Sequence, residues 1–169
     1  RDRSPSRGLG DVYKRQNQYE FETGVAGSKE ILYLGGDAYS AAAVYVKEGS
    51  GAWAVYYLCK DYLGSITHIV NSSGGLKQEL SYDAWGRLRN PANQALYAVG
   101  TEPTLFLGRG YTGHEHLTAF GLINMNARLY DPVIGRFLSP DPQLQDPYLS
   151  QNYNLSLIHI SEPTRRTPI

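Results

Sequence analysis

The sequence predicts an all-β fold built of short antiparallel hairpins. Turn-forming residues recur every few positions, with 18 Gly and 9 Pro among 169 residues. Between them lie short apolar or aromatic pieces that are rich in Tyr, of which there are 14. Gly permits positive φ, Pro fixes φ, and Asp or Asn closes turns through its side chain. Tyr suits half-buried strands, because its ring packs while its hydroxyl reaches water.

The upstream part, residues 17–56, predicts a series of hairpins. Its strand candidates are Tyr19 to Phe21, Ile31 to Leu34, Val44 to Val46 and the run Trp53 to Cys59. The segment from Ala38 to Ala43 could form a helical turn but is too short for an independent helix. Cys59 is the only cysteine, so no intrachain disulfide can form, and its place at the end of an apolar run predicts a buried side chain.

A turn motif of the form Asp-x-x-Gly-x-apolar repeats along the rest of the chain. The copies are Asp61 to Ile66, Tyr82 to Leu88, and Tyr130 to Phe137 with one inserted residue. In each, a strand ends, the Asp carboxylate caps the turn, and Gly takes the backbone conformation that other residues avoid. Between the first two copies, apolar runs flank Ser72 to Gly75, which predicts another hairpin.

The remaining stretches are less regular. Arg89 to Pro103 contains several structure breakers and predicts a loop, whereas Leu105 to Leu107 predicts a resumed strand. The trio Gly108 to Gly110 predicts only a turn, because no phosphate-binding Lys follows it. Asn124 to Leu129 could be extended or a helical turn, and the extended form is favoured.

The stretch Gly110 to Pro142 resembles the core signature of the RHS-repeat-associated (YD-repeat) family, and the resemblance extends over about Tyr57 to Asn154. The matching positions are Gly113, Gly121, Leu122, Ala127, Arg128, Tyr130, Asp131, Pro132, Gly135, Arg136, Phe137, Asp141 and Pro142. The resemblance implies a core at residues 57–154, truncated at its C-terminal end, that closes a spiral β shell. A hydrophobic face of such a repeat is buried by its neighbours, so we expect the segment 17–154 alone to be marginally stable.

The two ends of the chain do not look like protein sequence. Residues 2–16 read forwards and 155–169 read backwards can be paired codon by codon as reverse complements, as Gln16 with Leu155 and Arg15 with Ser156. This pattern predicts that residues 1–16 and 155–169 derive from one inverted DNA adapter, and such segments are excluded from fold reasoning.

Removing these ends changes the charge balance. The whole chain has 16 basic and 16 acidic residues; without the seven basic and three acidic residues of its ends, 9 and 13 remain. A net charge of −4 leaves no basic patch for a nucleic-acid partner. No apolar run approaches the length of about 20 residues that a membrane span needs.

Two sets of side chains are candidates for chemistry. His114 and His116 would share one face of a strand, but a metal site needs a further ligand, and a solvent-facing or turn-capping role is favoured; no metal or cofactor is expected. The second set is Arg128, Asp131 and Asp141. Two close carboxylates cannot both ionise easily, so one could act as an acid and the other as a base.

For that second set, the resemblance to toxin-associated family members implies an intramolecular aspartyl protease that cleaves the chain after the core. The alternative is that each Asp only precedes Pro in a turn. An independent enzyme is not expected.

The resemblance implies a structural function: a shell segment of a secreted or cell-surface bacterial toxin that encapsulates a C-terminal effector. The implied partners are that effector and the upstream YD repeats, with secretion machinery or cell-surface glycans as further options. The alternative is a cell-surface adhesion scaffold built of YD repeats.

Overall fold

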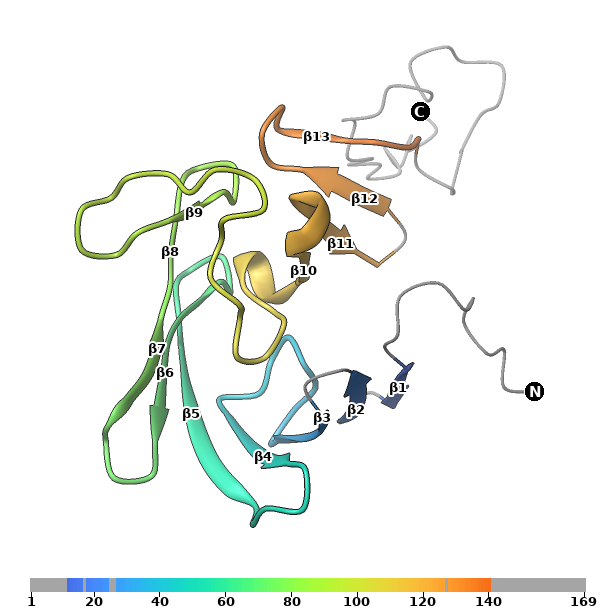
Figure 1. The fold of residues 1–169 in the computed structure, drawn as a ribbon, viewed down its shortest axis with the longest axis vertical. Helices are drawn as coiled ribbons and strands as arrows, with labels where there is room; N and C mark the ends of the chain where they lie inside the picture. The colour runs from blue at the N-terminus through green and yellow to red at the C-terminus, as the bar shows by residue number, and fades with distance from the viewer. Residues whose placement is uncertain (1–11, 17, 25–26, 127, 141–169) are drawn as a thin grey trace, which may run out of the picture.

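The computed structural model describes residues 12–16, 18–24, 27–126 and 128–140, and within them the chain is almost entirely β structure (Figure 1). A seven-stranded antiparallel sheet, here the wall sheet, contains its strands in chain order. They are β1 (Val12–Gln16), β2 (Tyr19–Gly24), β3 (Gly27–Leu34), β4 (Ala43–Glu48), β5 (Ala54–Lys60), β6 (Ile66–Asn71) and β7 (Leu76–Glu79). The predicted all-β fold of antiparallel hairpins is therefore confirmed.

Two smaller sheets follow the wall sheet. A hairpin consists of β8 (Ser81–Tyr82) and β9 (Leu88–Arg89). A four-stranded antiparallel sheet then contains β10 (Glu115–Leu117), β11 (Leu122–Met125), β12 (Arg128–Asp131) and β13 (Arg136–Phe137). Two short 3-10 turns, η1 (Tyr111–Gly113) and η2 (Thr118–Phe120), precede and follow β10. Figure 1 shows this second sheet, in orange, above the blue and cyan strands of the wall sheet.

Strand β1 lies in the segment that codon pairing assigns to adapter DNA. The structure pairs it with β2 in antiparallel register, Val12 opposite Thr23 and Gln16 opposite Tyr19. It forms one edge of the wall sheet. The origin of residues 1–16 stays a prediction.

The wall sheet has one buried face and one exposed face. On β3, Ile31 and Tyr33 are buried while Leu32 between them is 37% exposed. On β4, Val44 and Val46 point the same way as Ile31, into the core. Side chains along a strand point alternately to the two faces of the sheet, so the apolar residues at every second position form a continuous core.

The same alternation corrects the prediction for Cys59. Its neighbour Leu58 is buried, so Cys59 points to the other face and is exposed. The apolar run suggested burial of every member, whereas a strand with one solvent face buries only alternate residues.

The first two copies of the repeated turn motif form the same structure, a sharp turn between strands that we call a corner. Asp61 Oδ1 accepts hydrogen bonds from the backbone N–H groups of Leu63 (2.9 Å) and Ser65 (2.8 Å). Asp83 Oδ1 does so from Trp85 and Arg87, both at 2.9 Å. The glycines Gly64 and Gly86 have φ of 83° and 94°. The predicted capping by Asp and positive φ at Gly are confirmed.

A further copy of this corner joins β6 to β7. Asn71 Oδ1 accepts from the N–H groups of Ser73 (3.0 Å) and Gly75 (2.7 Å), and Gly74 has φ of 82°. The predicted hairpin around Ser72 to Gly75 is confirmed. Asn71 occupies the position in this turn that Asp61 and Asp83 occupy in theirs. Asn therefore supports this turn as Asp does, because only one side-chain oxygen is needed.

Other expectations have mixed outcomes. The predicted loop from Arg89 to Pro103 is confirmed, with one isolated bridge between Arg89 and Leu96. Ala38 to Ser40 forms a turn, closed by the Ala41 N–H donating to the Asp37 carbonyl at 2.9 Å. Asn124 to Leu129, for which the extended form was favoured, is extended at its two ends, in β11 and β12, whereas Asn126 lies in a turn with φ of 61°.

The strand predicted at Leu105 to Leu107 was wrong. These three residues are buried, but they lie before and within a turn closed by Gly108 N–H donating to the Leu105 carbonyl at 3.1 Å. An apolar run indicates burial, and here the buried residues insert side chains into the core without pairing as a strand.

Candidate functional site

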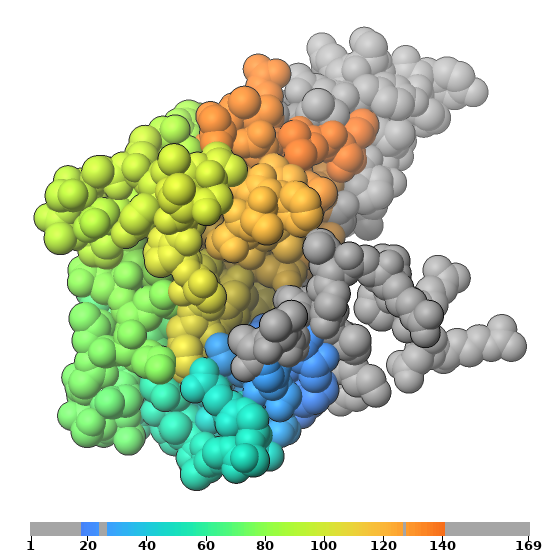
Figure 2. All heavy atoms as spheres, viewed as in Figure 1, coloured from blue at the N-terminus to red at the C-terminus, as the bar shows by residue number. Residues whose placement is uncertain are grey.

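The inner face of the wall sheet is covered by the chain that comes later. We call residues 104–113 the inner segment. Leu105, Phe106 and Leu107 belong to the same hydrophobic core as the buried side chains of β3 to β6. Figure 2 shows this part of the chain, in yellow, flanked by the blue, cyan and green strands. The sheet and the segment bury each other.

Hydrogen bonds attach the inner segment to separate strands of the wall sheet. At β7, Gln78 Nε2 donates to the Thr104 carbonyl (2.9 Å) and Gln78 Oε1 accepts from Phe106 N–H (2.7 Å). At β3, Lys29 Nζ donates to the Phe106 carbonyl and lies 4.5 Å from the Phe106 ring centroid. The backbone groups of Thr104 and Phe106 are thus bonded by side chains of the wall sheet rather than by a strand ladder.

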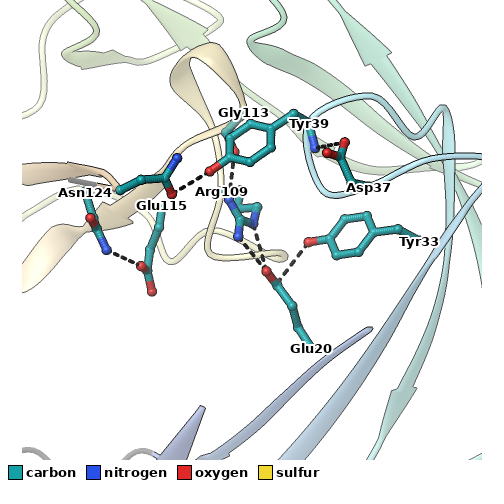
Figure 3. A network of polar contacts seen from close by, with 9 residues as sticks. Glu20, Tyr33, Asp37, Tyr39, Arg109, Gly113, Glu115 and Asn124 are labelled. Atoms are coloured by element: carbon teal, nitrogen blue, oxygen red, sulfur yellow. Dashed lines mark hydrogen bonds and ion pairs between the residues drawn. The ribbon is translucent and has the colours of Figure 1, made fainter. Parts of the chain in front are cut away.

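A buried ion pair attaches the inner segment to β2 through Arg109 and Glu20. Arg109 Nε and Nη2 both donate to Glu20 Oε1, and Nη1 donates to the Gly113 carbonyl at 3.0 Å (Figure 3). Tyr33 donates its hydroxyl to Glu20 Oε2 at 3.0 Å. The side chains of Arg109 and Glu20 are 5% and 7% exposed. We call Glu20, Tyr33 and Arg109 the buried clasp.

The charge state of the clasp follows from its partners. Burial alone would lower the pKa of Arg109, but the hydrogen bonds and negative charge of Glu20 raise it above its usual value. Burial, and then the charge of Glu20, raise the pKa of Tyr33. Arg109 is therefore a permanent cation and Tyr33 a neutral donor at any ordinary pH.

Tyr39 extends the clasp toward the second sheet. The Arg109 guanidinium carbon lies 5.3 Å from the Tyr39 ring centroid, and the Tyr39 hydroxyl donates to Asn126 Oδ1 at 2.8 Å. The His114 ring packs edge-on against Tyr39 with centroids 5.1 Å apart. Side chains from β2, β3, the inner segment and the β11–β12 turn are thus joined in one network (Figure 3).

The two histidines near β10 have different surroundings. His116 Nε2 accepts a hydrogen bond from Tyr111 N–H at 3.0 Å, and burial, followed by the proximity of His114, lowers the pKa of His116 to about 4. Burial and Arg109 also lower the pKa of His114. In the described part of the chain no group of three or more His, Cys, Asp or Glu could hold a metal ion.

The predicted self-cleavage residues lie at the other end of the second sheet. Asp131 ends β12 and its Oδ1 accepts from Val133 N–H (2.8 Å) and Ile134 N–H (3.4 Å). Arg128 begins the same strand, and its guanidinium carbon lies 3.8 Å from the Phe137 ring centroid. Strand geometry directs positions 128 and 131 to opposite faces. Asp141 lies outside the described residues, so the catalytic role stays a prediction.

The clasp was missed from sequence, although a weak indication existed. Gly108, Arg109 and Gly110 suggested only a turn. In the structure Gly110 is also tightly packed, since a Cβ there would lie 2.6 Å from Tyr82 Oη and 3.0 Å from His116 Nε2. Glu20 lies between the half-buried Tyr19 and Phe21 and is itself buried, so the aromatic residues of this run do not mark the buried face of β2. What the sequence offered was a charged residue among the core-facing residues of each segment, Glu20 in β2 and Arg109 in the inner segment.

These features define a β-shell repeat protein: hairpins of one kind follow each other in a meander, and the chain that follows them packs on their inner face. The chain belongs to the teneurin YD-shell family, whose model matches residues 49–162. The predicted YD-repeat identity is therefore confirmed. The match continues past Asn154.

Comparisons with individual proteins agree on the fold. The chain is similar to salivary gland surface protein 1 of Aedes aegypti, 36% identical over 95 residues, which cover 55% of this chain and 3% of that protein. Among solved structures, TcdB2-TccC3 has 22% identity and a TM-score of 0.59, covering 78% of this chain and 6% of that chain. The Photorhabdus luminescens Tc holotoxin pore has 19% identity and a TM-score of 0.61, covering 88% and 7%.

The chain therefore spans only a small part of the length of these relatives. At this level of identity the solved structures establish the fold alone. No helix within the described ranges is long and apolar enough to cross a membrane.

Proposed function

We propose that this chain is a wall segment of a YD shell that encloses the polypeptide following it. The single observation that carries the proposal is the inner segment, because the wall sheet already covers ten residues of downstream chain, 104–113, with hydrogen bonds at β7, β3 and β2. A longer shell of the same hairpins would present a larger inner surface to a longer enclosed chain.

The nature of the enclosed chain is the finer part of the proposal. We place a C-terminal effector there, as in a secreted or cell-surface bacterial toxin. One solved relative is described as TcdB2-TccC3 without its hypervariable C-terminal region, with 20% identity, a TM-score of 0.61, and coverage of 87% of this chain and 7% of that chain. The hypervariable C-terminal region of that protein supports an effector after the shell here.

The boundaries of the native protein are part of the same proposal. Residues 1–16 and 155–169 would be adapter-derived, 17–56 an upstream repeat region, and 57–154 a truncated core. The test is to sequence the source DNA across the codon for Asn154 without a transposase-made library. A frame that continues into an Asn/Tyr-rich strand and a divergent domain supports encapsulation, whereas a genomic frame that encodes Leu155 to Ile169 contradicts the adapter origin of the two ends.

Release of the effector by self-cleavage would use Arg128, Asp131 and Asp141. Replacing Asp with Asn is the informative change, because Asn71 caps its turn as Asp61 and Asp83 cap theirs, so the substitution removes the charge and keeps the turn. Asp131→Asn should keep the turn and abolish cleavage in the parent protein, as should Asp141→Asn. Continued cleavage by a folded Asp131→Asn protein would show that Asp131 only caps its turn, and the matched variant Asp83→Asn should cleave normally.

A second candidate function is a cell-surface scaffold. It is favoured by the similarity to a protein named salivary gland surface protein 1. The two candidates differ in what lies beyond the core: further repeats with a wall or membrane anchor would indicate the scaffold, with surface glycans as partners. A divergent domain would indicate the toxin, with secretion machinery as a partner.

A further inference from the structure

Two of the repeated corners face each other across a surface hollow of about 380 Å³, which we call the corner pocket. The Asp61 corner forms one side and the Asp83 corner the other. The residues that line it are Asp61, Tyr62, Leu63, Thr67, Leu80, Ser81, Tyr82, Asp83, Ala84 and Tyr111. It lies apart from Arg128 and Asp131, and neither the shell function nor self-cleavage uses it.

The pocket is negatively charged. Its lining contains the carboxylates Asp61 and Asp83 and no Lys or Arg. Asp83 is largely compensated, because Arg87 Nε donates to its Oδ2 at 2.7 Å. Asp61 uses only Oδ1, for Leu63 and Ser65 N–H, and no ion pair within the described residues neutralises it. Burial raises the pKa values of Tyr82 and Tyr111, and the negative charge of Asp61 raises them further.

The pocket is also aromatic. Tyr62 is 94% exposed, so its ring is available to a ligand. The other two hydroxyls are engaged with the backbone: Tyr82 donates to the Ile66 carbonyl (2.8 Å) and Tyr111 to the Ala84 carbonyl (3.1 Å). The rings of Tyr82 and Tyr111 also pack against each other, with centroids 5.9 Å apart. The Asp61 carboxylate and the Tyr62 ring therefore remain as the groups that can contact a ligand.

We propose that the corner pocket binds the guanidinium group of an arginine side chain from another polypeptide segment. A guanidinium is planar, donates in a fork to a carboxylate and stacks on aromatic rings. This protein already contains that combination once, since Arg109 pairs with Glu20 and lies over Tyr39. The corner pocket offers the same two partners, Asp61 and Tyr62, with the position of the cation open to solvent.

The test is an NMR titration of the full 169-residue chain with N-acetyl-arginine methylamide, with the citrulline analogue as the neutral isostere. We expect saturable shifts of the amides of Leu63 and Ser65 with a dissociation constant of about 1 mM, and none with citrulline. Equal binding of citrulline, or no saturable shift at about 50 mM arginine ligand, would overturn the proposal.

Variants separate the charge from the fold. Asp61→Asn should weaken binding about tenfold while keeping the turn, as Asn71 does in its own corner. Tyr62→Leu should weaken it about two- to fivefold. Glu48→Gln removes one exposed charge outside the pocket and should leave the affinity unchanged. Undiminished binding by Asp61→Asn would place the ligand elsewhere and refute the assignment.

A final arm identifies the source of the guanidinium. An arginine within a polypeptide has amide groups on both sides of its Cα, whereas free arginine has an ammonium and a carboxylate there, whose charges add to zero. Weaker binding of free arginine than of the capped form supports a polypeptide ligand. Equal binding of both retains a guanidinium site but overturns the assignment to a polypeptide segment.

Discussion

Replacing Arg109 with Met removes the cation of the buried clasp and should cost more stability than any other single charge in the described structure. The variant takes the guanidinium away from the buried Glu20 carboxylate, to which the Tyr33 hydroxyl still donates, and it removes the donor to the Gly113 carbonyl. Loss of one partner of a buried ion pair typically costs about 3–5 kcal/mol, because the remaining charge is uncompensated. The near-complete burial of both side chains justifies that range rather than a surface value.

The assay is urea unfolding of the full chain followed by tyrosine and tryptophan fluorescence. With a slope of about 2 kcal/mol per M, the midpoint should fall by roughly 1.5–2.5 M. If the variant is unfolded in water, the same comparison is made for both proteins in an osmolyte that stabilises compact states. Arg109→Lys should lie between the two, because Lys keeps the charge but cannot donate in a fork.

A double-mutant cycle isolates the pair. Glu20→Gln, Arg109→Met and the double variant should show a coupling energy of about 2 kcal/mol or more. The matched control is Arg87→Met, whose partially exposed ion pair with Asp83 should contribute less than about 1 kcal/mol. A loss below about 1 kcal/mol for Arg109→Met, or a coupling energy near zero, would refute the assignment of the clasp as the main polar link.

Two further predictions use features of the same region. The folded-state pKa of His116 is about 4, below an unfolded value of about 6.5, so its stabilising effect is full above pH 6.5 and decreases as pH falls toward 4. Wild type should therefore lose roughly 2 kcal/mol more than His116→Gln between pH 7 and pH 5 in urea unfolding, and equal losses would contradict this. Gly74→Ala and Gly86→Ala carry the same positive-φ strain, but a Cβ at Gly86 would lie 2.6 Å from Tyr111 Cδ1, whereas Gly74 has open space. Gly86→Ala should be at least about 1 kcal/mol less stable than Gly74→Ala, and similar stabilities would show that the Tyr111 ring moves aside.

The corners were predictable from sequence because their geometry is local. Asp at the first position and Gly at the fourth satisfy a turn within five residues, so Asp61 and Asp83 needed no knowledge of the rest of the fold. Asn71 was missed as a member of the set because the motif was defined by Asp, although the turn requires only an oxygen acceptor.

The inner segment and the clasp were not predictable because they depend on distant residues. Arg109 and Glu20 are 89 positions apart, and nothing local to either indicates the other. For Leu105 to Leu107 the apolar run indicated burial correctly but not the partner, so a strand was inferred where side chains insert into the wall. Cys59 failed for a different reason, since an apolar run does not show which strand face is solvated.

The most direct test of the central claim, that the wall sheet encloses the chain following it, is residue-resolved hydrogen exchange of the full chain. The N–H groups of Phe106 and Thr112 donate to wall side chains, Gln78 Oε1 and Ser65 Oγ, although neither belongs to a strand. We predict that both exchange as slowly as the amides of β3 and β4. Exchange as fast as in the exposed loop at residues 91–100 would show that the inner segment is not held by the wall and would contradict the account.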